Sequence, residues 1–330
     1  MTTMKSLLGA AAALAFSAAG ALAEPAIIFD LGGKFDRSFN ESAFNGAERW
    51  AEETGGTYRE IELQNDAQRE QAMRRLAEAG ANPIVMAGFS QASALEVVAP
   101  DYPDTTFVII DGVVDAPNVQ SIIFSEHEGS YLVGMLAGMA SETGTVSFVG
   151  GMDIPLISRF ACGYAQGVVA ADPEATVIAN MTGTTPAAWN DPVRGGELTR
   201  GQIGQGSDVV FAAAGGTGLG VLQTAADEGI LSIGVDANQN YLHPGMVLTS
   251  MIKRVDVAVY DAFSADTIEP GIFVYGLAED GVGYALDEFN QELITEEMIA
   301  AVDAAREQII AGELSVHNFT DDGTCPVEMQ

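Results

Sequence analysis

The chain has 330 residues, and 14 lysines and arginines stand against 46 aspartates and glutamates, for a formal net charge of −32 at pH 7. Nucleic acids and anionic membrane surfaces are therefore excluded as favourable partners. The acidic residues are dispersed along the chain, which is typical of a well-solvated surface.

The N-terminus has the pattern of a secretory signal peptide. Lys5 precedes an apolar run, 7–22, that is rich in Ala and Leu, and Ala21-Leu22-Ala23 closes it. We expect cleavage after Ala23. A transmembrane anchor is disfavoured because a bilayer span needs roughly 20 apolar residues and Ala is only mildly apolar. No Cys lies near the cleavage point, so the sequence predicts an exported, soluble protein without a lipid anchor.

The first half of the chain alternates short apolar runs with longer amphipathic segments. Strands are predicted over 26–29, 83–86 and 106–110, and helices over 42–54 and 92–99. This alternation is typical of a parallel sheet covered by helices.

The same rhythm restarts after a predicted small-residue helix over 131–140. Strands are predicted over 145–149, 176–179, 209–212 and 232–235. A helix over 255–263, a strand over 273–275 and a helix over 295–311, ended by Gly312, follow this block.

Two such blocks predict an α/β protein with two Rossmann-like lobes. The elements left over after the second block predict that the chain crosses back between the lobes through a hinge of several strands. We expect one lobe to comprise 24–125 and about 249–283, and the other 126–248 and about 284–330.

The two cysteines, Cys162 and Cys325, lie far apart in the sequence. In an exported protein they favour a disulfide that ties the C-terminal tail to the body, although two free thiols remain the alternative.

The motifs of catalysis are missing from the sequence. His127, His243 and His317 lack metal-ligand spacing, and no HExxH, CxxC, GxSxG or Walker A motif is present. The glycine-rich segment 215–220 reads GGxGxG instead of the dinucleotide fingerprint, with Asp236 as a weak candidate for its acidic partner. We therefore expect a protein that is not an enzyme and has neither a metal nor a cofactor.

Polar and aromatic residues follow the predicted strands, where open α/β sheets bind ligands. In the first lobe these are Asp36, Phe39, Asn40, Phe89 and Asp111, and in the second Trp189, Asp191, Gly215 and Asp236. Taken singly, each Asp is equally typical of a helix cap or a turn, and each aromatic residue of the core. Together, flat rings and carboxylates suit a nucleoside or a sugar better than an anion.

Five segments, in order along the chain, resemble those of one known family. They are 35–42 (FDRSFNES), 189–192 (WNDP), 208–215 (DVVFAAAG), 233–236 (IGVD) and 248–253 (LTSMIK). Together they resemble the basic membrane protein family of binding proteins, whose best-understood members are purine-nucleoside receptors.

The resemblance implies a type I periplasmic binding protein fold that closes over its ligand. A base would stack between Phe39 and Trp189, with Phe160 beside them. The remaining implied roles are base-edge recognition by Asp36 and Asn40, and ribose binding by Asp111, Asp236 and Lys253.

The resemblance also implies a function. The chain would be a monomeric periplasmic receptor that captures a purine nucleoside or base, such as adenosine, guanosine, inosine or adenine, and delivers it to the membrane permease of an ABC transporter. Many family members carry a lipid on an N-terminal Cys, which this chain lacks. A sugar receptor on the same fold, a sensory role and an exported nucleoside-processing enzyme remain the alternatives.

Overall fold

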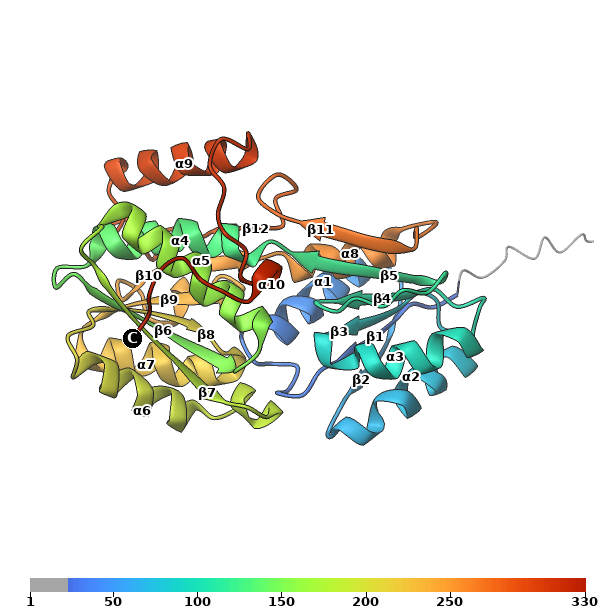
Figure 1. Ribbon diagram of the computed structural model, residues 1–330. Coiled ribbons are helices and arrows are strands. Elements are labelled where there is room, and N and C mark those ends of the chain that lie inside the picture. Colours follow the sequence, from blue (N-terminus) through green and yellow to red (C-terminus); the bar gives the residue numbers. More distant parts are fainter. Residues whose placement is uncertain (1–22) are drawn as a thin grey trace, which may run out of the picture.

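The computed structural model describes residues 23–330, and it forms two α/β lobes side by side (Figure 1). The predicted signal peptide lies outside the described residues, apart from Ala23. Each lobe contains one six-stranded sheet, in agreement with the predicted fold class. No helix within residues 23–330 is both long and apolar enough to span a membrane.

The first sheet has the strand order β11-β5-β4-β3-β1-β2, and all its strands run parallel. Its strands are β1 (Ala26–Phe29), β2 (Arg59–Glu62), β3 (Ile84–Ala87), β4 (Phe107–Ile110), β5 (Val119–Phe124) and β11 (Gly271–Tyr275). Its helices are α1 (Phe39–Thr54), α2 (Arg69–Glu78), α3 (Ala92–Val98) and α8 (Val255–Ser264). Strands β1, β3 and β4 are fully buried because helices cover both faces of the sheet.

The second sheet has the order β12-β10-β9-β8-β6-β7, in which only β12 runs antiparallel, against β10. Its strands are β6 (Thr145–Met152), β7 (Thr176–Gly183), β8 (Val209–Ala213), β9 (Leu231–Asp236), β10 (Val247–Lys253) and β12 (Val282–Tyr284). The helices that follow or cover them are α4 (Glu126–Ala140), α5 (Pro155–Ala171), α6 (Pro192–Ile203), α7 (Gly218–Glu228), α9 (Glu296–Ile310) and the short α10 (Phe319–Asp322).

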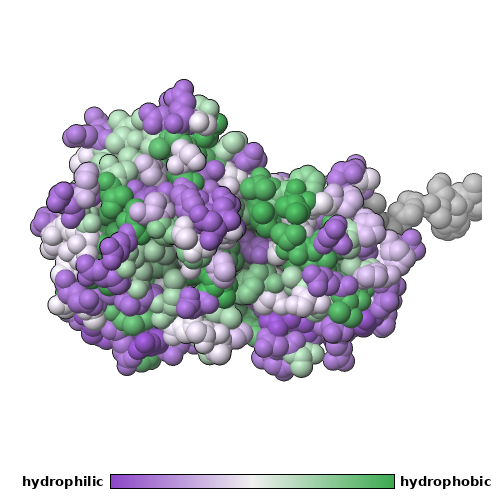
Figure 2. All heavy atoms as spheres, in the orientation of Figure 1, coloured by the Kyte–Doolittle hydropathy of each residue, from purple (hydrophilic) through white to green (hydrophobic). Residues whose placement is uncertain are grey.

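The chain passes between the two sheets three times. It leaves the first sheet between β5 and α4, returns between β10 and α8, and leaves again between β11 and β12. A space-filling view shows a largely hydrophilic surface that is hollowed between the lobes (Figure 2). The lobe boundaries given above stay a prediction, although β10, which includes Lys253, lies in the second sheet while the prediction placed residues from about 249 in the first lobe.

Several elements differ from those expected. Helix α1 begins at Phe39, before the predicted 42, because the Asp36 side chain accepts hydrogen bonds from the backbone N–H groups of Ser38, Asn40 and Glu41 and thereby caps its first turn. Helix α4 begins at Glu126, before the predicted 131. The edge strand β2, with its charged residues, and the glycine-containing helices α5, α6 and α7 were not predicted from the pattern of apolar residues.

Helices α4 and α5 pack so closely that glycine is required at their contact. A Cβ atom on Gly167 would lie 2.0 Å from the backbone oxygen of Tyr131, and one on Gly134 would lie 2.2 Å from that of Tyr164. Both obstructing atoms belong to helix backbone, which cannot rotate away as a side chain can. The small residues of these helices therefore fix the framework from which the site residues extend.

We predict that Gly167→Ala destabilises the protein by about 1 to 3 kcal/mol, because the added methyl group overpacks the α4–α5 contact. Gly201→Ala is the matched control: Gly201 also lies in a helix, but a Cβ atom there meets nothing within 4 Å. That control should be neutral or more stable by up to about 1 kcal/mol. Urea unfolding of both variants measures the difference, and equal stabilities would contradict the packing argument.

Candidate ligand-binding site

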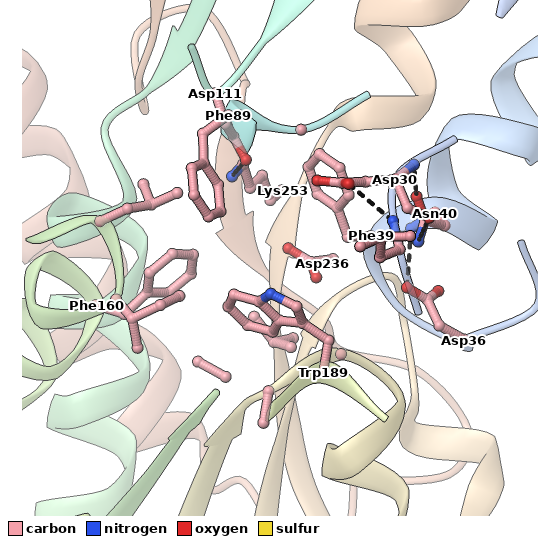
Figure 3. Close-up of a pocket in the computed structure, with 18 residues that line it drawn as sticks. Asp30, Asp36, Phe39, Asn40, Phe89, Asp111, Phe160, Trp189, Asp236 and Lys253 are labelled. Carbon is pink, nitrogen blue, oxygen red and sulfur yellow. Dashed lines mark hydrogen bonds and ion pairs between the residues drawn. The ribbon is translucent and has the colours of Figure 1, made fainter. Parts of the chain in front are cut away.

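A pocket lies between the lobes, beyond the carboxyl ends of the strands of both sheets (Figure 3). It has a volume of about 620 Å³, including space open to solvent. The predicted site residues that line it are Asp36, Phe39, Asn40, Phe89 and Asp111 from the first lobe, and Phe160, Trp189, Gly215, Asp236 and Lys253 from the second. The structure thus brings together all the predicted ligand-binding residues except Asp191.

The ammonium group of Lys253 is the buried positive charge of this pocket. Its Nζ donates to Asp111 Oδ2 at 2.6 Å and lies 2.9 Å from Glu126 Oε1. Burial alone would lower its pKa, but the carboxylates of Asp111 and Glu126 raise the pKa of Lys253 above its ordinary value. Lys253 is therefore charged at neutral pH. The second oxygen of Asp111, Oδ1, is buried and has no hydrogen-bond partner.

Asp236 extends from the end of β9 and connects the lobes. Its Oδ2 accepts a hydrogen bond of 2.5 Å from the Ser38 hydroxyl of the first lobe. Burial raises the pKa of Asp236 to about 6, so this carboxyl group titrates just below neutral pH.

Asp36 and Asn40 also line the pocket, but their polar atoms are largely used within the first lobe. Burial raises the pKa of Asp36 to about 6, and its oxygens cap helix α1 as described above. Asn40 Oδ1 accepts the backbone N–H of Asp30 at 3.2 Å, and its Nδ2 donates to the Gly33 carbonyl at 3.3 Å. These bonds fix the turn over 30–40 and present Phe39 to the pocket.

Four aromatic rings border the pocket in Figure 3, those of Phe39, Phe89, Phe160 and Trp189. Trp189 ends the 3-10 helix η4 (Pro186–Trp189), and a Cβ atom on Gly151 would come within 2.1 Å of its ring. Glycine at position 151 thus makes room for this indole. Planar faces beside carboxylates can stack on a flat ring while polar groups bind its substituents.

The remaining predicted residue, Asp191, does not line the pocket. It is the N-cap of α6, where its Oδ1 accepts the backbone N–H of Arg194 at 3.0 Å. Its own backbone N–H donates to Thr217 Oγ1 at 2.7 Å. Asp191 therefore has the helix-cap role that was the alternative for each strand-end Asp.

Sequence reasoning missed several lining residues. Asp30 directly follows β1 and lines the pocket, with Oδ2 held by the Ser90 hydroxyl and Oδ1 by Arg69 at 3.3 Å. Its place at a strand end could have identified it. Leu156 and Ile157 were missed because α5 itself was not predicted.

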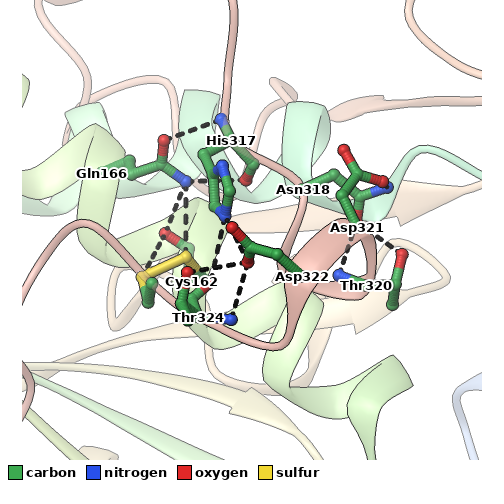
Figure 4. Close-up of polar contacts among 9 residues, drawn as sticks. Cys162, Gln166, His317, Asn318, Thr320, Asp321, Asp322 and Thr324 are labelled. Carbon is green, nitrogen blue, oxygen red and sulfur yellow. Dashed lines mark hydrogen bonds and ion pairs between the residues drawn. A yellow bond between two sulfur atoms is a disulfide. The ribbon is translucent and has the colours of Figure 1, made fainter.

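The two cysteines, for which a disulfide and free thiols were both open, are bonded: a disulfide joins Cys162 of α5 to Cys325 (Figure 4). Next to it, the Gln166 amide donates to the His317 carbonyl at 2.9 Å and accepts from the His317 N–H at 2.8 Å. The C-terminal segment is thereby attached to α5. Among residues 23–330, no group of three or more His, Cys, Asp or Glu side chains is arranged to hold a metal ion.

The model of the Bmp family, described as ABC transporter substrate-binding protein PnrA-like, matches residues 24–319. The ABC transporter nucleoside-binding protein BmpA of Lactococcus lactis is 33% identical, with 88% of each chain covered. A solved ABC transporter solute-binding protein of Aeropyrum pernix is 28% identical, with a TM-score of 0.80 over 89% of this chain and 92% of its own.

One prediction from the sequence is contradicted by relatives. An uncharacterized lipoprotein of Pyrococcus furiosus is 34% identical, with 88% of this chain and 80% of its own covered, and relatives in two other Pyrococcus species are also named lipoproteins. These names indicate lipid-anchored proteins attached to a membrane. The prediction of a free periplasmic protein without a lipid anchor, which rested on the lack of a Cys near Ala23, is therefore withdrawn.

We predict that Asp236 makes the ligand-free protein less stable as the pH rises from about 4 to about 7. Its pKa is about 6 in the folded state and about 3.9 in an unfolded chain. Between these values the folded state keeps a proton that the unfolded state releases, so this contribution is present at low pH and is lost as the pH rises through 6.

Asp236→Asn has no such proton. The free energy of unfolding of the wild type relative to this variant should fall by roughly 2 to 3 kcal/mol over this pH range. Urea unfolding of both proteins at several pH values measures the change. A difference that does not vary with pH would show that Asp236 titrates normally.

Proposed function

The chain belongs to the Bmp family of PnrA-like ABC transporter substrate-binding proteins, and on that premise we propose that it captures a purine nucleoside between its lobes and delivers it to the permease of an ABC transporter. The observation that carries this proposal is the unpartnered, buried Asp111 Oδ1 beside the Lys253 ammonium group in the pocket between the lobes.

The polar end of the pocket has the chemistry that a pair of ribose hydroxyls requires. A hydroxyl group both donates and accepts a hydrogen bond. Asp111 Oδ1 can accept from one hydroxyl, Asp236 can accept from another, and Lys253 can donate to either. A buried acceptor without a partner costs about 1 to 3 kcal/mol, and a ligand hydroxyl would remove that cost.

The other end of the pocket has the chemistry that a purine requires. Phe39 and Trp189 offer faces on which a planar base can stack, and Phe160 adds a third ring. Stacking on aromatic side chains is worth about 1 to 3 kcal/mol per base. The name of the Lactococcus relative, a nucleoside-binding protein, supports the same ligand class.

Capture would occur by closure of the lobes. Beside the Ser38–Asp236 and Lys253–Asp111 contacts, the Gln239 amide donates to the Arg37 carbonyl at 2.8 Å across the lobes. Because binding groups come from both lobes, the ligand has more contacts in the closed form and stabilises it. We expect a monomer, since closure and docking on the permease need a single copy.

We predict that the protein, freed of carried-over ligand by unfolding and refolding, binds adenosine, guanosine or inosine more tightly than adenine or ribose. Adenine can satisfy only the aromatic end of the pocket, and ribose only the polar end. Titration calorimetry with all five compounds measures the affinities. Tight binding of ribose alone would favour a sugar receptor. No detectable binding of any of the five compounds would exclude purine nucleosides and bases as the ligand class. Incubation with inosine followed by assay for free hypoxanthine tests the enzyme alternative.

We predict that Trp189→Ala weakens nucleoside binding by about 1 to 3 kcal/mol, the value of one stacked base. Ribose lacks a base and cannot stack on this ring, so the affinity for ribose should not change in the variant. Calorimetry gives the affinity, and circular dichroism checks that the variant is folded. An unchanged nucleoside affinity in a folded variant would remove Trp189 from the proposed site.

A further inference from the structure

The ammonium group of Lys253 is paired with a carboxylate, that of Glu126, which does not line the pocket. An ammonium group has three N–H donors. One is bonded to Asp111 at 2.6 Å, and a second carboxylate, Glu126, lies 2.9 Å from Nζ. Glu126 does not line the pocket, whereas Lys253 does. Glu126 Oε1 is thus paired with the Lys253 charge without a hydrogen bond, and Lys253 keeps N–H donors available to a ligand.

Glu126 lies where the chain passes between the lobes. It is the first residue of α4, two residues after the end of β5, and it is completely buried. A buried carboxylate is stable only when it is paired. Burial alone would raise its pKa, but the charges of Lys253 and Arg159 hold the pKa of Glu126 below its ordinary value, so Glu126 is ionised.

Arg159 completes the arrangement from helix α5. Its Nη1 donates to Glu126 Oε2 at 2.7 Å and to the carbonyl oxygen of Phe124, the last residue of β5, at 2.8 Å. Its Nη2 donates to Thr320 Oγ1 of the C-terminal segment at 3.0 Å. Arg159 therefore fixes the Glu126 carboxylate against the chain crossing and balances its charge.

The surroundings of Lys253 explain why this support matters. The rings of Phe39, Phe124 and Phe160 lie 5.1 to 5.6 Å from Nζ and surround the ammonium group with apolar faces. Without the charge of Glu126, the nearest attraction for Nζ is Asp111, whose free Oδ1 would then compete for it. Lys253 would occupy the acceptor that a ligand hydroxyl needs.

We propose that Glu126 and Arg159 are positioning residues for ligand binding: they hold the Lys253 ammonium group away from Asp111 Oδ1 so that both groups are available to ligand hydroxyls. The part of this inference that concerns hydroxyls rests on the proposed function. The position of Lys253 itself does not depend on it.

The first test is the affinity of Glu126→Gln for two ligands. We expect it to lose about tenfold or more in affinity for the nucleoside that the wild type prefers, and much less for its 2′,3′-dideoxy analogue, which lacks the hydroxyls. Glu128→Gln is the control, because Glu128 lies on the same helix and accepts the Leu277 N–H at 2.9 Å instead of contacting Lys253. It should bind both ligands as the wild type does.

A double-mutant cycle separates positioning from a general loss of structure. If Glu126 acts through Lys253, Glu126→Gln should have no further effect on affinity in a Lys253→Met background. Equal losses for both ligands, or additive losses in the cycle, would overturn the proposal. If Glu126→Gln does not fold, Arg159→Lys, which keeps the charge but cannot bond to Glu126, Phe124 and Thr320 together, should give a smaller loss with the same ligand preference.

The second test needs no ligand. Lys34 and Lys253 are the lysines of the described residues, so ¹⁵N-lysine labelling gives a simple NMR spectrum of their ammonium groups, and Lys253→Met identifies the Lys253 signal. In Glu126→Gln we expect the Lys253 signal to shift and its hydrogens to exchange faster, while the signal of Lys34, paired with Glu60 at 2.7 Å, stays unchanged. An unchanged Lys253 signal would overturn the positioning role.

These tests fail separately. A wild type that binds no nucleoside overturns the proposed function but leaves the NMR test of Lys253 intact. A wild type that binds nucleosides, together with an unaltered Glu126→Gln variant, overturns the positioning role alone.

Discussion

The ion pair between Lys253 and Asp111 is the interaction on which the arrangement of the pocket depends. Lys253 ends β10 in the second sheet and Asp111 follows β4 in the first, so their 2.6 Å contact joins strand ends of the two lobes. Both side chains are almost completely buried, and a buried charge without a partner is strongly destabilising. Separation of the lobes would expose this pair to water, and the proposed closure would bring it together again.

The apolar scaffold of each lobe and the polar groups of the pocket occupy separate parts of the molecule. The strands are buried apolar segments, and helices α4 and α5 of the second lobe pack backbone against backbone. The polar groups lie beyond the strand ends, where no sheet neighbour uses them. A rigid scaffold with its binding groups at one edge can hold distances constant within each lobe while the gap between lobes changes.

The site contains two of the few cations of this acidic chain. A chain with a net charge of −32 has few cations, yet it places Lys253 and Arg159 side by side with Glu126 near the chain crossing. Dispersed surface carboxylates are solvated and contribute little to binding. The buried carboxylates are different. Burial raises the pKa of Asp236 towards neutrality, and the low dielectric constant of the interior strengthens each hydrogen bond in the pocket.

The sequence by itself determined the two-lobed α/β architecture and most of the pocket. Apolar strand periodicity is a local property, and residues beyond the carboxyl ends of strands, such as Asp111 in the first lobe and Asp236 in the second, lie where open sheets of this class bind ligands. The tertiary structure alone decided that Asp191 caps a helix, that Asp30 lines the pocket, and that Glu126 supports Lys253. Those roles depend on which groups come within hydrogen-bond distance of one another, and residues 126 and 253 become neighbours only because the fold brings the start of α4, after the first crossing, beside the end of β10, before the second.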